Sequence, residues 1–148
     1  MPKINEANDK ATVEQAITSL ADFDARVNEV IETGAGNTRI IEFYMRKGKL
    51  FINSSSYAQN NRSEIVMTLD GLSKPYSEPG VEIPIGRIKV NSSEGQKTSS
   101  VSLRVSYSWI NITYDDSNIN KKFTSAPTPY NFFIENKGNN WIDISEGS

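Results

Sequence analysis

The chain has 148 residues, with 16 lysine and arginine residues against 18 aspartate and glutamate residues, so its net charge at pH 7 is −2. The basic residues are scattered along the chain, which argues against nucleic acid as a partner. Histidine and cysteine are both absent. Their absence removes the commonest general base, the commonest transition-metal ligands and any disulfide. We therefore expect no metal site, no cofactor and no enzymatic activity.

Residues 1–11 are polar and show neither a helical nor a strand period. We expect them to form a flexible tail, which is either a docking segment that inserts into a larger assembly or a frayed end. The opening residues lack the apolar segment of a secretory signal, and no run approaches the length of a membrane span. We therefore expect no membrane partner.

Residues 12–33 carry the strongest helical pattern in the chain. Their apolar side chains recur at alternating steps of three and four residues over three heptads, at the positions called a and d in a coiled coil. Thr12 suits an N-terminal cap with Gln15 three residues later, and Gly34 suits the residue that ends a helix. The six ridge positions are Val13, Ala16, Leu20, Phe23, Val27 and Val30.

This apolar ridge has two interpretations. The helix can pack on the β domain of its own chain, or copies of it can form a parallel coiled coil. We favour the coiled coil because the heptad spacing is unbroken and because the glycine-rich linker at 34–38 can separate the helix from the following residues. Ile17 and Ile31 widen the apolar face beyond a dimer seam, so the sequence predicts a homotrimer held by the six ridge residues.

From residue 39 onward the apolar period changes from 3.6 to 2, which indicates β-strands. Residues 40–45 and 50–52 flank a tight turn and predict a hairpin. Residues 54–62 form a polar loop, and the alternation at 65–69 is typical of a half-buried strand.

The second half of the chain continues this pattern. Residues 101–109 alternate so that Trp109 faces the same way as the apolar strand residues. Residues 115–129 read as one long irregular loop, and residues 131–135 pair with 141–144 in a last hairpin. With about eight strands in residues 39–148, the sequence predicts a mainly β fold: an antiparallel, jelly-roll-like β-sandwich head behind the helix.

Two loops hold the residue types that bind sugars, which are flat aromatic rings and short planar polar groups. Binding residues tend to lie on such non-strand segments. The candidates in or beside the first loop are Tyr57, Asn60 and Arg62, and those around the second loop are Tyr114, Asp115, Asp116, Asn118 and Tyr130.

The order of helix, glycine linker and β head resembles the receptor-binding and lower-baseplate proteins of tailed bacteriophages, and also phage fibre tips. The segments 75–90 and 138–144 (GNNWIDI) are similar to the closing segments of such tips. The resemblance implies a virion protein that forms a homotrimer and binds cell-wall saccharide of a bacterial host. It also implies contacts with other tail or baseplate proteins through the N-terminal region, but it transfers no individual residue.

Three functional hypotheses follow. The leading one is a non-enzymatic trimeric phage adhesin whose β heads bind host saccharide. The alternative is a structural virion component, such as a baseplate adaptor or a head or tail decoration fibre, that binds protein only. The third is a polysaccharide depolymerase that uses Asp115 and Asp116, although adjacent acidic residues on a loop are more typical of a solvated turn.

Overall fold

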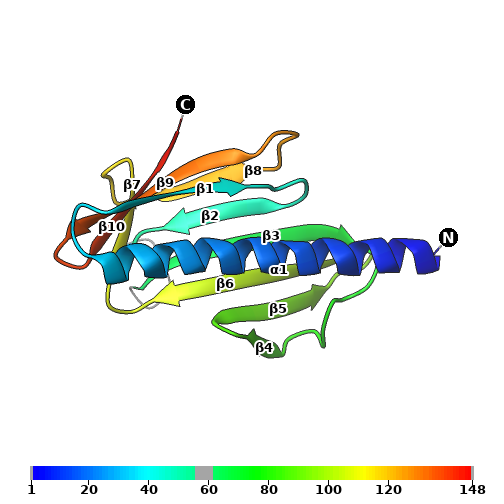
Figure 1. Cartoon of the computed structure of the whole chain (residues 1–148). Helices are drawn as coiled ribbons and strands as arrows, with labels where there is room; N and C mark the ends of the chain where they lie inside the picture. Colours follow the sequence, from blue (N-terminus) through cyan, green and yellow to red (C-terminus); the bar gives the residue numbers. More distant parts are fainter. Residues whose placement is uncertain (1, 56–61, 148) are drawn as a thin grey trace.

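The computed structural model describes residues 2–55 and 62–147. Within these residues the fold is mainly β, with a single long helix and two sheets (Figure 1). The elements are α1 (Pro2–Thr33), β1 (Thr38–Phe43), β2 (Lys49–Asn53), β3 (Ser63–Leu72), β4 (Glu82–Ile85), β5 (Ile88–Glu94), β6 (Ser99–Tyr107), β7 (Asn111–Tyr114), β8 (Asn120–Thr124), β9 (Tyr130–Gly138) and β10 (Trp141–Glu146).

Helix α1 begins at Pro2, well before the predicted start at Thr12. The Thr12 hydroxyl does not cap a helix, because it donates to the carbonyl oxygen of Asn8 one turn earlier. The first turns are also tied to the sheets: the Asp9 carboxylate accepts hydrogen bonds from the backbone N–H and the hydroxyl of Ser73, at 2.7 and 2.8 Å. The expected flexible tail is therefore helical over the residues that the structure describes. At the other end, Gly34 adopts a φ of 89° and ends the helix as predicted.

The six ridge side chains are buried against the sheets of their own chain, with exposed fractions between 0 and 7%. Phe23 lies at their centre, with its ring edge-on to Phe43 of β1 at 5.8 Å and to Phe132 of β9 at 5.6 Å. The described part of the chain thus shows no coiled coil, and the predicted trimerisation seam is already filled. The other interpretation, in which the helix packs on its own β domain, is the one that the structure shows. Helix α1 and the strands therefore share one hydrophobic core.

The strands form a four-stranded sheet in the order β1-β9-β10-β7 and a six-stranded sheet in the order β4-β5-β6-β3-β2-β8. Helix α1 runs along the direction of β3 and β6 and contacts members of both sheets, including β1, β9, β3 and β6 (Figure 1). Most pairs are antiparallel, but β7 and β10 are parallel. The ten strands and this parallel pair differ from the eight antiparallel strands that the sequence predicts.

The predicted hairpin between β1 and β2 is wrong, because the two strands belong to different sheets. β1 pairs with β9, and β2 pairs with β3 and β8. The tight connection holds Gly48 at a φ of 89°, and a Cβ there would collide with the carbonyl oxygen of Thr68. A tight turn with glycine can thus connect strands of two different sheets. The local sequence alone does not distinguish this connection from a hairpin.

Other strand predictions are confirmed. The alternation at 65–69 lies in β3, and the last hairpin is formed by β9 and β10. The expected irregular loop at 115–129 is wrong, because it contains β8 at the edge of the six-stranded sheet. Trp109 is also misplaced by the sequence pattern, since it follows the end of β6 and is 49% exposed.

We predict that Phe23→Ala lowers the free energy of unfolding by about 3–5 kcal/mol, because it leaves a cavity between the helix and both sheets. Urea unfolding at two protein concentrations measures this. Asp22→Ala, at the exposed neighbouring position, is the matched control and changes stability by less than about 0.5 kcal/mol. A Phe23→Ala variant that is as stable as the wild type would contradict the packing of Phe23 in this core.

Candidate functional site

The bases of the two predicted loops meet at β7. The side-chain oxygen of Asn111 accepts hydrogen bonds from the Ser55 N–H, the Ser55 hydroxyl and the Ser63 hydroxyl. The amide nitrogen of Asn111 donates to Asn118 at 2.8 Å. The structure therefore brings the first loop and residues 115–119 of the second together, whereas Ala126, after β8, bonds to the Met45 carbonyl elsewhere. Arg62 is exposed. Tyr57 and Asn60, the other candidates of the first loop, lie outside the described residues.

Tyr114 and Tyr130 belong to the edge of the core. Tyr114 is only 6% exposed and packs edge-on against Phe123 at 5.5 Å. Burial raises its pKa to about 12, and the nearby carboxylates of Glu146 and Asp115 act in the same direction. Tyr130 stacks on Phe132 at 5.8 Å. Their rings are thus occupied by other rings, which makes neither an open platform for a sugar.

Asp115 and Asp116 form an ordered two-residue turn. Both have positive φ values, 49° and 62°, and Tyr114 and Ser117 exchange backbone hydrogen bonds across the turn. The Asp116 carboxylate lies 3.4 Å from the Lys137 ammonium, and this hydrogen bond raises the pKa of Lys137. The two candidate carboxylates of a depolymerase are therefore turn residues, one of which is paired with a lysine.

A chain of hydrogen bonds runs from this turn to a tryptophan. Asp143 of β10 is buried, and its Oδ1 accepts from the Asp116 N–H at 2.7 Å and from the Thr113 hydroxyl at 2.6 Å. The Thr113 hydroxyl in turn accepts from the indole N–H of Trp141 at 2.7 Å. This arrangement depends on the parallel pairing of β7 and β10, which places Thr113 beside Asp143. The indole of Trp141 is thereby held in one orientation.

Trp141 also borders a surface hollow of about 240 Å³. The hollow lies between the C-terminal end of α1, Ala35 two residues beyond it, Ile110 directly before β7 and the turn that joins β9 to β10. Its lining combines aliphatic side chains, one indole and several amides. The lining residues are Ile31, Ala35, Ile110, Asn136, Gly138, Asn139, Asn140, Trp141 and Ile142.

The walls of the hollow are fixed by backbone geometry. Gly138, Asn139 and Asn140 have positive φ values of 87°, 54° and 58°, a conformation that glycine and asparagine tolerate best. The side chain of Asn136 donates to the Val30 carbonyl of the last helical turn and accepts from the Gly138 N–H. The helix end and the β9–β10 turn are thus clamped together.

The sequence pattern did not single out this hollow. It marked 138–144 only as a segment similar to fibre tips. A signal was present, because glycine followed by two asparagines suits a turn of consecutive positive φ values. The sequence around residues 138–141 does not indicate that the end of α1 forms the opposite wall of the hollow.

Comparisons with family models, with curated proteins and with solved structures found no match. Over residues 2–55 and 62–147, no helix combines the length and apolarity needed to cross a membrane. The same residues contain no group of three or more acidic side chains placed to hold a metal ion. The geometry of the Trp141 hollow is therefore the observation from which function can be argued.

We predict that Asp143→Asn stabilises the fold at neutral pH. Burial raises the pKa of Asp143 above the ordinary carboxyl value of about 3.9. The contribution of this carboxyl group to the free energy of unfolding is therefore complete below that ordinary pKa and is lost as the pH rises through the folded-state pKa. Asparagine keeps an oxygen for both hydrogen bonds and carries no buried charge. Urea unfolding should show a more stable variant near pH 7 and a smaller or absent gain near pH 3.

Asp115→Asn, at the exposed neighbour of Asp116, is the control and should show no such pH-dependent gain. A variant Asp143→Asn that is less stable than the wild type at neutral pH would show that the charged carboxylate itself holds the β7–β10 pair.

Proposed function

We propose that the protein is a non-enzymatic saccharide-binding protein and that the Trp141 hollow is its binding site. The supporting observation is an indole whose orientation is fixed by the Thr113 hydroxyl, at the border of a hollow lined by amide and aliphatic side chains. Preformed sites of this kind bind with little loss of side-chain entropy.

The residue types around the hollow suit a sugar ring. The C–H face of a pyranose packs on an indole, and its hydroxyls need short polar partners such as the side chains of Asn139 and Asn140. Ile31 and Ile110 supply an apolar wall, which suits an N-acetyl or deoxy group. A volume of about 240 Å³ limits the hollow to about one ring.

The proposed setting is that of the sequence resemblance, a tail or baseplate adhesin of a bacteriophage that binds host cell-wall saccharide. Its support is the placement of the two ends of α1. Ile31 of the last turn and Ala35, two residues beyond the helix, line the hollow, whereas the first turns extend past the strands at the other end (Figure 1). The helix of 32 residues is about 48 Å long at 1.5 Å per residue. An N-terminal attachment to other virion proteins would therefore leave the hollow accessible.

A homotrimer remains part of this proposal, because linked copies of a weak sugar site raise the apparent affinity. Its interface would have to use another surface, since the helix ridge is buried in the core of its own chain.

The second candidate function is a structural virion component that binds protein only, either as a baseplate adaptor or as a decoration fibre. Two exposed apolar side chains favour it, Ile40 of β1 at 63% exposed and Tyr44 directly after β1 at 48%. Exposed apolar residues of this size occur at protein contacts. This role predicts that the purified protein ignores host cell walls and still binds a virion protein.

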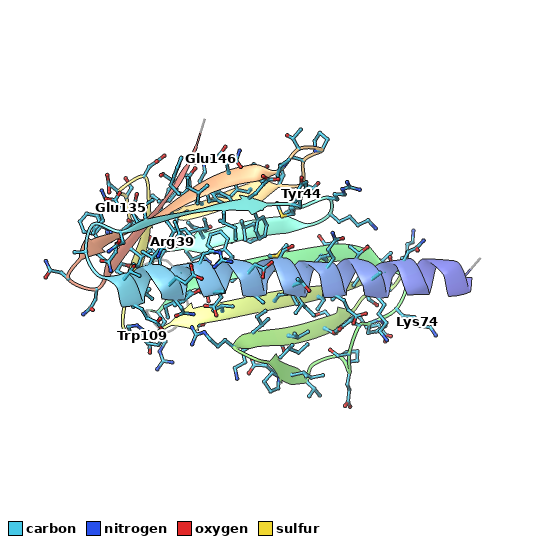
Figure 2. All side chains as sticks on the ribbon, in the orientation of Figure 1. Arg39, Tyr44, Lys74, Trp109, Glu135 and Glu146 are labelled. Atoms are coloured by element: carbon cyan, nitrogen blue, oxygen red, sulfur yellow. The ribbon has the colours of Figure 1, made fainter. Side chains whose placement is uncertain are left out.

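We predict that Trp141→Ala weakens binding to purified bacterial cell-wall polysaccharide about tenfold or more, because the sugar loses its stacking surface. Binding is measured by glycan array and then by calorimetry, with the urea midpoint as a check on folding. Trp141→Phe should retain part of the affinity, and Tyr44→Ala should retain all of it, because Tyr44 lies at the end of β1 away from the C-terminal end of α1 (Figure 2). Unchanged binding by Trp141→Ala would contradict the site.

A further inference from the structure

Trp109 is an exposed tryptophan on the connection between β6 and β7. It is 49% exposed, and Figure 2 shows it beyond the end of β6, beside the C-terminal end of α1. Tryptophan is highly buried on average, and an exposed indole with a packed partner offers a large apolar face with a polar N–H, as tryptophans at interfaces do.

The indole is supported from one side by a fixed cation. The Arg87 guanidinium lies 5.7 Å from the centroid of the Trp109 ring and 5.4 Å from that of Tyr107. Its Nε donates to Asp24 of α1 at 2.9 Å. The Arg87 guanidinium is thus held by the Asp24 carboxylate and the Tyr107 ring, and it also contacts the Trp109 ring.

The partners of Arg87 are themselves fixed. Asp24 is 7% exposed, and its other carboxylate oxygen accepts the hydroxyl of the fully buried Tyr107 at 2.6 Å. Burial and the Asp24 charge both raise the pKa of Tyr107, so this hydroxyl keeps its proton. The support under Trp109 therefore extends back to the helix, and the indole is a pre-organised surface.

This surface lies next to the Trp141 hollow. Ile110 lines the hollow, and Trp109 is the preceding residue, so their Cα atoms are about 3.8 Å apart. The hollow has room for about one ring, and a sugar chain that leaves it along the β6–β7 connection meets Trp109 next.

We propose that the saccharide site is extended: one sugar unit occupies the Trp141 hollow, and a following unit of the same chain stacks on Trp109 beside Arg87. The ligand class is therefore a saccharide chain of several units. This inference rests on the proposed function and adds a second contact region to it.

The test uses oligosaccharides fractionated by length, from monosaccharide upward, prepared by mild acid hydrolysis of the cell-wall polysaccharide that binds the wild-type protein. Calorimetry measures the affinity of each fraction. For the wild type, affinity rises with length and then levels off. Trp109→Ala should lose this rise, binding long fractions about tenfold more weakly while leaving the monosaccharide unchanged.

Trp109→Phe should keep part of the rise, because it keeps an aromatic face. Tyr44→Ala is the matched control, since Tyr44 is 48% exposed and Trp109 is 49% exposed; it should behave as the wild type at every length. Trp141→Ala should weaken binding at every length, including the monosaccharide.

Two outcomes would overturn the inference and leave the proposed function standing: an unchanged length dependence in Trp109→Ala, or an equal loss at all lengths, while Trp141→Ala still weakens binding. Loss of a virion-protein contact in Trp109→Ala with saccharide binding intact would also overturn it and would make Trp109 part of a protein interface. If Trp141→Ala changes nothing, the proposed function itself fails.

Discussion

The fold depends on the burial of one helical ridge against two sheets. Side chains such as Leu20, Phe23 and Val27 have no measurable exposure, although they lie on a helix at the surface. Each buried side chain of this size contributes about 1.5–3 kcal/mol relative to an exposed one. Most of the stability of a helix in a protein comes from the packing of its apolar face, so the sheets stabilise the helix. The helix in turn covers apolar side chains of both sheets, and Phe23 contacts rings from β1 and β9 at once.

This packing also decides where the proposed binding surface forms. Because α1 is fixed along its length, its last turn is presented to the β9–β10 turn, and the bond from Asn136 to the Val30 carbonyl joins the two. The last turn of α1 and the β9–β10 turn each form one wall of the hollow beside Trp141. The pair of Asp24 and Arg87 repeats the principle at the β6–β7 connection, where a helix carboxylate positions the cation beside Trp109. Both surfaces are thus consequences of where the helix lies.

The sequence predicts features that are set locally and misses those set by distant partners. Gly34 marked the helix end, and the alternation in β3 and the β9–β10 hairpin were read correctly because their signals lie within a few residues. The unbroken heptad spacing favoured sister helices, whereas the ridge packs on the sheets of its own chain, because spacing shows an apolar face but not the partner that covers it. The pairing of β1 with β9 joins segments about ninety residues apart, and no local pattern encodes it. At the candidate site, the predicted saccharide-binding residues do not include those that line the Trp141 hollow. The rings of Tyr114 and Tyr130 pack on other rings, and the orientation of Trp141 depends on a hydrogen bond across the β7–β10 pair, neither of which a local pattern shows.

The most direct test of the central claim asks whether Phe23 packs on its own chain. Isotope-labelled and unlabelled protein are unfolded together, refolded as an equal mixture and studied by isotope-filtered nuclear Overhauser spectroscopy. The account predicts contacts from the Phe23 ring to the Phe43 and Phe132 rings in fully labelled protein, and no such contacts between labelled and unlabelled chains. Contacts that appear between chains would show that the ridge is buried by a sister copy, and would contradict the account.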